Sequence, residues 1–300
     1  MKRILITGKT GTVGSNLNFG IGTNSKECNL KNKNEVDALL DRVDPDGIIH
    51  CAAKVGGLKM HLDQRYSLFY DNLVINTNII ECAKAKKIQR VLSFLSSCIF
   101  SDKSKSPHTE LMIHELPPVS VHLPYGHAKR MLEVHSRLCY EEFGLTYNCV
   151  IPTNIYGIND DFNMETGHVM GVLIHKGYLS YLNGVDFVVW GDGNQEREFL
   201  FTEDVSKITE WLLHNYKEKE PLILSTNSPV KIKDIAYLIA ERFGVLNKLR
   251  FDTSAPSGQT NRSLDGTKLT EVYKNNFTPI EEGLTKTIDW FLSKYPNIRL

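Results

Sequence analysis

Residues 3–14 read RILITGKTGTVG, an apolar run followed at once by three glycines in the spacing G-x-x-G-x-x-G. The apolar run is typical of a buried strand, Arg3–Thr7. Glycine at these spacings permits a tight turn, lets backbone N–H groups approach a pyrophosphate and packs the following helix on the strand. The stretch predicts a dinucleotide-binding unit, with an ordinary glycine-rich turn as the alternative at this point. The predicted cofactor-binding residues are Gly8, Thr10, Gly11, Thr12, Val13 and Gly14.

The first half of the chain alternates short apolar runs with helical patterns, which predicts βαβ units and an α/β fold: a Rossmann-type, doubly wound parallel sheet. The expected strands are Arg3–Thr7, Gly47–Cys51, Arg90–Ser96 and Tyr147–Pro152. The expected helices are Asn34–Val43, Tyr66–Lys86 and Pro124–Phe143.

The second half is more mixed and predicts a smaller α/β substrate-binding lobe. Helical patterns fall at His168–Leu182, Thr202–Tyr216, Ile232–Phe243 and Ile280–Tyr295, and strands at 187–190 and 221–226. We expect residues 1–157 to form the NADP(H)-binding domain with returning elements around 200–226, and residues 158–300 to form mainly the substrate lobe.

The second strand of a dinucleotide-binding fold usually ends in an acidic residue that holds the ribose hydroxyls of NAD. Residues 16–30, NLNFGIGTNSKECNL, are too short and broken for a full helix and strand, and no acid follows a clear apolar run. Lys9, Lys26 and the hydroxyls of Thr10, Thr23 and Ser25 could instead serve a 2′-phosphate. These residues leave the choice between NADP and NAD open.

Composition excludes several classes of partner. Lys+Arg and Asp+Glu both number 35, so the chain has no net basic field to hold a nucleic acid or an anionic membrane. No signal-peptide core and no membrane-length apolar run occurs. The six cysteines lack CxxC spacing, which favours reduced thiols in a cytoplasmic protein. No HExxH or paired Cys/His spacing indicates a metal site.

Three residues in order complete a second motif. Ser96 follows the predicted strand at 90–96, and Tyr125 and Lys129 lie four residues apart on the predicted helix. A lysine ammonium near a phenol favours the phenolate, so we expect Lys129 to lower the pKa of Tyr125. The serine and tyrosine hydroxyls can bind a substrate carbonyl oxygen while a nicotinamide gives a hydride to the carbon and tyrosine gives the proton.

Seven stretches resemble the GDP-L-fucose synthase family (GDP-4-keto-6-deoxy-mannose 3,5-epimerase/4-reductase), within the extended short-chain dehydrogenase/reductases. The family implies a Rossmann domain with a smaller substrate lobe, NADPH as cofactor (NADH stays an alternative), a GDP-sugar substrate and a homodimer through the helices at 66–86 and 124–143. The stretches are CAAKVGG (51–57), SSCIF (96–100), PYGHAK (124–129), PTNIYG (152–157), GHVMGVLIHK (167–176), VVWGDGNQEREFL (188–200) and SGQTNRSLD (257–265).

The resemblance also implies residue roles. Ser96, Tyr125 and Lys129 fall on the reductase triad, Cys98 on the epimerisation base and His168 on its partner acid. The implied cofactor-lining residues are Ala52, Ala53, Tyr125, Lys129, Pro152, Thr153, Asn154, Ile155 and His168. The implied GDP-sugar-binding residues are Asn154, Lys176, Trp190, Arg197 and Asp265. The expected reaction epimerises C3 and C5 of a GDP-4-keto-6-deoxy sugar and reduces C4.

Other functions compete with this prediction. A nucleotide-sugar dehydratase usually has an Asp-Glu pair just after the serine position, where this chain has Cys98-Ile99. A simple 4-epimerase needs no thiol there. A monofunctional 4-reductase, acting after another enzyme has epimerised the sugar, and a catalytically silent NADP(H)-binding subunit both stay open.

Overall fold

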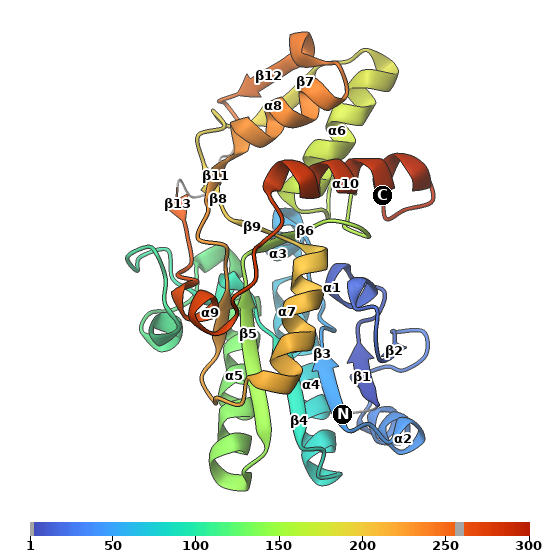
Figure 1. Cartoon of the computed structure of the whole chain (residues 1–300), viewed down its shortest axis with the longest axis vertical. Helices are drawn as coiled ribbons and strands as arrows, with labels where there is room; N and C mark the ends of the chain where they lie inside the picture. Colours follow the sequence, from blue (N-terminus) through green and yellow to red (C-terminus); the bar gives the residue numbers. More distant parts are fainter. Residues whose placement is uncertain (1–2, 256–260) are drawn as a thin grey trace.

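A six-stranded sheet organises the chain in the computed structural model, which describes residues 3–255 and 261–300 (Figure 1). All of its neighbouring strands are parallel, in the order β10-β5-β4-β3-β1-β2. The Rossmann-type fold predicted from the sequence is therefore confirmed. The strands are β1 (Ile4–Thr7), β2 (Ile21–Thr23), β3 (Gly47–His50), β4 (Arg90–Phe94), β5 (Thr146–Pro152) and β10 (Leu222–Leu224).

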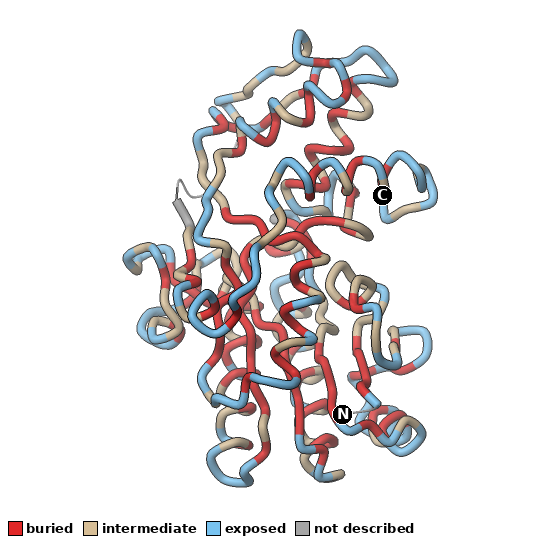
Figure 2. The backbone as a smooth tube through the Cα atoms, viewed as in Figure 1, coloured by how far each residue is buried: buried red, intermediate tan, exposed pale blue. Residues whose placement is uncertain are grey.

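Helices cover both faces of this sheet because successive strand residues point to opposite sides. In β1, Leu5 joins one hydrophobic core, whereas Ile4 and Ile6 join another. Figure 2 shows the resulting buried strands between more exposed helices. The first core is covered by α2 (Lys33–Val43), α4 (Arg65–Ala85) and α5 (Leu123–Phe143). The second is covered mainly by α7 (Thr202–Asn215), with α9 (Thr267–Val272) at its edge.

A smaller α/β lobe lies beyond the carboxyl ends of the strands, at the top of Figure 1. A third core, which includes Phe187, Ile239 and Phe291, holds it together. Its main elements are α6 (Val169–Asn183), β7 (Phe187–Trp190), α8 (Ile232–Arg242), β12 (Leu249–Asp252) and α10 (Ile280–Lys294). The connecting short strands are β6 (Asn154–Tyr156), β8 (Glu196–Arg197), β9 (Phe199–Phe201), β11 (Val230–Lys231) and β13 (Asn261–Arg262). Residues 257–260 of the stretch SGQTNRSLD lie outside the described residues.

The contracted segment after the glycine loop forms only small elements. The helix α1 (Thr12–Asn16) has 5 residues and β2 has 3. Gly8 has a φ of +70°, which favours glycine, and a Cβ on Gly14 would lie 2.3 Å from the Gly8 carbonyl oxygen. The strand and helix can approach this closely only because both residues are glycine.

No helix within the described ranges 3–255 and 261–300 is long and apolar enough to cross a membrane. All six cysteines are free thiols, four of them buried.

Candidate active site

One cavity of about 1430 Å³ lies between the carboxyl ends of the sheet strands and the smaller lobe. After β1 the chain forms β2 on one side and β3 on the other, so the strand order reverses between β1 and β3. In open α/β sheets this reversal creates the crevice in which ligands bind. The glycine loop, the end of β4 and the start of α6 all line the cavity.

The structure brings nearly all of the predicted site residues to this cavity. From the cofactor set these are Gly8, Thr10, Gly11, Thr12, Val13, Gly14, Ala52, Ala53, Pro152, Thr153, Asn154 and Ile155. From the catalytic and sugar-binding sets they are Ser96, Cys98, Tyr125, Lys129, His168, Lys176, Trp190 and Arg197. Asp265 is not among the described residues that line it. Its carboxylate instead accepts a hydrogen bond from the Thr267 amide at 2.9 Å, at the start of α9.

Tyr125 and Lys129 lie one turn apart on α5 and are both buried. The Nζ atom of Lys129 donates to the Phe94 carbonyl oxygen at 2.7 Å and lies 5.8 Å from the centre of the Tyr125 ring. Burial lowers the pKa of Lys129 to about 8.

The pKa of Tyr125 moves opposite to the sequence prediction. Burial raises it, and the nearby Cys98 thiol raises it further. The expectation that the pKa is lowered is wrong for this structure, because the removal of the phenol from water dominates the shift. Tyr125 therefore keeps its proton at neutral pH, as a group that donates a proton must.

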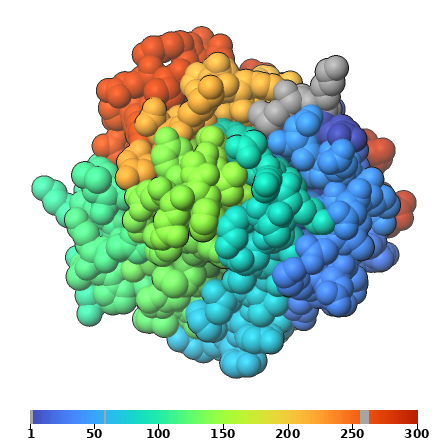
Figure 3. Space-filling model, turned by 90° about the horizontal axis from the view of Figure 1, so that it is seen from below, coloured from blue at the N-terminus to red at the C-terminus, as the bar shows by residue number. Residues whose placement is uncertain are grey.

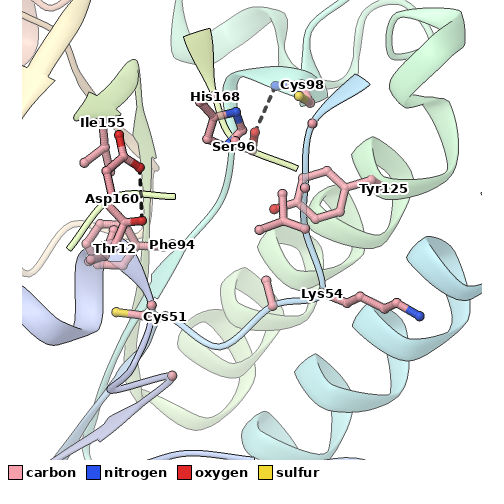
Figure 4. Close-up of a pocket in the computed structure, with 18 of the residues that line it drawn as sticks. Thr12, Cys51, Lys54, Phe94, Ser96, Cys98, Tyr125, Ile155, Asp160 and His168 are labelled. Carbon is pink, nitrogen blue, oxygen red and sulfur yellow. Dashed lines mark hydrogen bonds between the residues drawn. The ribbon is translucent and has the colours of Figure 1, made fainter. Parts of the chain in front are cut away.

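Ser96 and Cys98 lie where β4 ends and a short 3₁₀ turn (Ser97–Ile99) begins. The Ser96 hydroxyl oxygen accepts a hydrogen bond from the Cys98 amide at 3.2 Å, so its own O–H can still donate to a ligand. Figure 4 shows the side chains of Ser96, Cys98 and His168 at one end of the cavity, with Tyr125 nearby.

His168 immediately precedes α6, and its side chain lines the cavity. The residue is exposed to the cavity. Partial desolvation by the cavity walls lowers the pKa of its ring; Asp161 opposes the shift and Arg299 adds to it. A lowered pKa makes the protonated imidazole a stronger acid while reducing the fraction that is protonated.

Three of the predicted sugar-binding residues, Lys176, Trp190 and Arg197, lie in the cavity wall on the side of the smaller lobe. Lys176 donates to the Val188 carbonyl oxygen at 3.0 Å, and its Nζ lies 5.1 Å from the centre of the Trp190 ring. Arg197 donates to the Glu196 carbonyl oxygen at 2.6 Å. Trp190 is 57% exposed and offers an apolar surface to a ligand. A guanidinium, an ammonium and an aromatic face suit a nucleoside diphosphate.

The far end of the cavity, at the end of β2, has the chemistry of an adenosine-ribose site. Thr23, Asn24 and Ser25 line it, together with Lys31 and Lys54. Both lysines form ion pairs with Asp71, at 3.2 and 3.3 Å. Lys26 is not among the described lining residues, and Lys9 donates to the Leu17 carbonyl oxygen. The glycine loop fits a dinucleotide. Lys9 and Lys26, which the sequence suggested for a 2′-phosphate, do not form such a site in this structure.

The cavity residues that sequence reasoning missed include His61, His122, Asp160 and Arg299. His61 is 3% exposed, and its ring lies 5.5 Å from that of Tyr125 and 4.2 Å from that of His122. Burial lowers the pKa of His61 to about 4, so its ring is neutral. No local motif marks these residues, because the tertiary fold alone brings them to the cavity.

Among the side chains that the structure describes, no group of three or more His, Cys, Asp or Glu residues could hold a metal ion.

Comparison with known proteins places this fold and site in a class. Residues 20–224 match the NAD dependent epimerase/dehydratase family, and the chain belongs to that family.

Within it, the chain is similar over its full length to proteins named GDP-L-fucose synthase. It is 36% identical to the one from Dictyostelium discoideum, covering 99% of this chain and 98% of that protein. It is 32% identical to the probable one from Drosophila melanogaster, covering 100% of both. The crystal structure of a GDP-L-fucose synthetase from Naegleria fowleri bound to NADP superposes with a TM-score of 0.93, at 33% identity and covering 100% and 95% of the two chains.

Proposed function

We propose that the protein epimerises C3 and C5 of a GDP-4-keto-6-deoxy sugar and reduces C4 with NADPH, giving GDP-L-fucose or a close relative. One observation carries the proposal: Ser96, Cys98, Tyr125 and His168 line the same cavity as the glycine loop. The full-length similarity to GDP-L-fucose synthases supports the choice of substrate.

Reduction uses the residues at the end of β4 and on α5. NADPH, when bound, supplies the hydride for C4. The O–H groups of Ser96 and Tyr125 bind the C4 carbonyl oxygen, and Tyr125, which keeps its proton at neutral pH, donates it to the developing alkoxide. Lys129, fixed by its bond to the Phe94 carbonyl, stabilises the tyrosinate that results.

Epimerisation uses the acidity of the hydrogens next to a carbonyl. At C3 and C5 the enolate left by proton loss is stabilised by the same Ser96 and Tyr125 donors. Cys98, as a thiolate, removes the proton, and protonated His168 returns one to the opposite face of the ring. The Cys98-Ile99 pair provides no carboxylate at the position used by dehydratases, which argues against elimination of water.

Incubation with GDP-4-keto-6-deoxy-mannose and NADPH in deuterated water, followed by mass and NMR analysis, tests the proposal. Deuterium at both C3 and C5 together with NADPH oxidation is the expected result. Reduction without deuterium would leave only the monofunctional 4-reductase. Interconversion at C4 alone would favour a 4-epimerase, and NADPH binding without oxidation would favour the silent subunit.

The roles of the two parts of the chain and the location of the protein are further parts of the proposal. Residues 1–157, with returning elements around 200–226, bind NADP(H), and residues 158–300 mainly bind the GDP-sugar. We assign the protein to the cytoplasm because its cysteines are free.

A homodimer through α4 and α5 is supported by the surface of these helices, which lie side by side in the view of Figure 3. Tyr66 on α4 is 76% exposed and Met131 on α5 is 42% exposed. Both line an apolar groove of about 510 Å³ together with Phe69, Leu123 and Pro124.

A further inference from the structure

Residues from opposite ends of the sequence meet at the glycine loop. The Nη2 atom of Arg299 donates to the Thr12 hydroxyl at 2.8 Å and also to the Asn159 carbonyl oxygen. The Arg299 carbonyl oxygen accepts from the Phe162 amide at 3.0 Å, which fixes the backbone beside the cavity. Both Arg299 and Thr12 line the cavity.

Thr12 connects this guanidinium to a buried acid. Its hydroxyl lies 3.4 Å from Oδ1 of Asp160, which also accepts from the Asp161 amide at 2.8 Å, and Figure 4 shows the Thr12–Asp160 pair. Asp160 is 1% exposed, and its Oδ2 has no hydrogen-bond partner among the residues that the structure describes. A buried polar atom left unpaired at a ligand cavity points to a missing partner.

The negative charge of a bound diphosphate would also favour a cation beside the glycine loop. A dinucleotide diphosphate at the glycine loop carries two negative charges, and the loop's own Lys9 is bonded to the Leu17 carbonyl. The buried Asp160 carboxyl would repel the diphosphate if it were ionised. An arginine fork matches phosphate oxygens in pairs, whereas a lysine offers a point charge.

We propose that Arg299 is the cation that binds the diphosphate of the dinucleotide, exchanging its bond to Thr12 for phosphate oxygens. The inference rests on the proposed function only in that the ligand is NADP(H). It adds a binding residue that lies far from the glycine motif in the sequence, in a segment that packs on the smaller lobe.

The test compares NADPH with adenosine 2′-monophosphate, which keeps the adenosine and the 2′-phosphate but lacks the diphosphate. Arg299→Gln should weaken NADPH binding about tenfold to a hundredfold, the usual effect of losing a charge-assisted hydrogen bond. It should leave the affinity for adenosine 2′-monophosphate, measured by displacement of NADPH fluorescence, unchanged. Arg299→Lys should fall between Gln and wild type.

Arg250→Gln is the matched control, because this exposed arginine on β12 also bonds to backbone carbonyls but does not line the cavity. It should bind NADPH as wild type does, and thermal unfolding should show that all variants are folded. Equal NADPH affinity for Arg299→Gln and wild type would overturn the inference, as would an equal loss for both ligands. Failure of the wild-type protein to bind NADPH would instead refute the proposed function.

Discussion

Cys98 and Tyr125 share a cavity, but the proposed mechanism gives them separable roles. Cys98 lies on the turn after β4 with its amide bonded to Ser96, whereas Tyr125 is held on α5 with its pKa raised by burial. If the Cys98 thiol is the base for proton removal, its loss should leave hydride transfer intact. Loss of the Tyr125 phenol should stop hydride transfer.

Two variants test this separation. Cys98→Ser should slow deuterium incorporation at C3 and C5 by about 10²–10⁴-fold, the usual contribution of a general base, with NADPH affinity unchanged. Tyr125→Phe should abolish NADPH oxidation by the 4-keto sugar. Wild-type deuterium incorporation by Cys98→Ser would show that another residue is the base.

Asp160 makes the stability of the protein depend on pH. Burial raises the pKa of its carboxyl to about 7 in the folded state. The hydrogen bond from the Asp161 amide, the charge of Arg299 and the Thr12 hydroxyl oppose the shift, and the charge of the Asp161 carboxylate adds to it. In the unfolded chain the pKa is about 4, so between about pH 4 and 7 the unfolded state releases this proton first. Stability from this residue is therefore lost as the pH rises through that window, by about 1.4 kcal/mol per pH unit.

Asp160→Asn should remove this dependence. Its free energy of unfolding relative to wild type, measured by urea denaturation, should increase steadily from about pH 4 to 7 and level off above. A constant difference across the whole range would show that Asp160 is ionised in the folded protein.

At the scale of elements, the glycine loop joins β1 to α1 by an approach that tolerates no side chain at one position. A Cβ on Gly14 would lie 2.3 Å from the Gly8 carbonyl oxygen, whereas a Cβ on Gly11 would make an ordinary contact at 3.4 Å. Gly14→Ala should therefore destabilise the fold by about 1–3 kcal/mol, the usual cost of overpacking, and Gly11→Ala should not. Equal unfolding midpoints for the two variants would show that the loop can relax.

The long elements were predictable because burial of one or two of their faces places apolar residues at a regular spacing in the sequence. The helix expected at 124–143 is α5 (Leu123–Phe143), and the strand expected at 147–152 is β5 (Thr146–Pro152). Strands as short as β8 and β11 carry no period. They were missed, since their pairing partner alone makes them strands.

The candidate site was predictable only where a motif carried it. The order of glycine loop, serine and Tyr-x-x-x-Lys led to one cavity, but Arg299 and Asp160 belong to no local pattern. The pKa of Tyr125 was mispredicted because helical spacing reports the nearby lysine and not the depth of burial.

At the scale of the whole molecule, the proposed homodimer would bury exposed apolar side chains on α4 and α5. Met131 on α5 and Leu292 on α10 are each 42% exposed, but only Met131 lines the apolar groove. Met131→Glu should yield a monomer in light scattering, because it buries a charge in the interface. Leu292→Glu should stay dimeric, and a monomeric wild-type protein would contradict the proposed assembly.

The position of β10 in the sheet has a consequence for fragments of the chain. β10 (Leu222–Leu224) pairs with β5, although the chain forms several elements of the smaller lobe, including α6 and β7, between these two strands. A fragment ending at residue 157 would leave the whole length of β5 as an open edge and uncover the apolar face under α7. Unpaired apolar edges recruit strands from other molecules, so the cofactor half on its own should aggregate rather than fold.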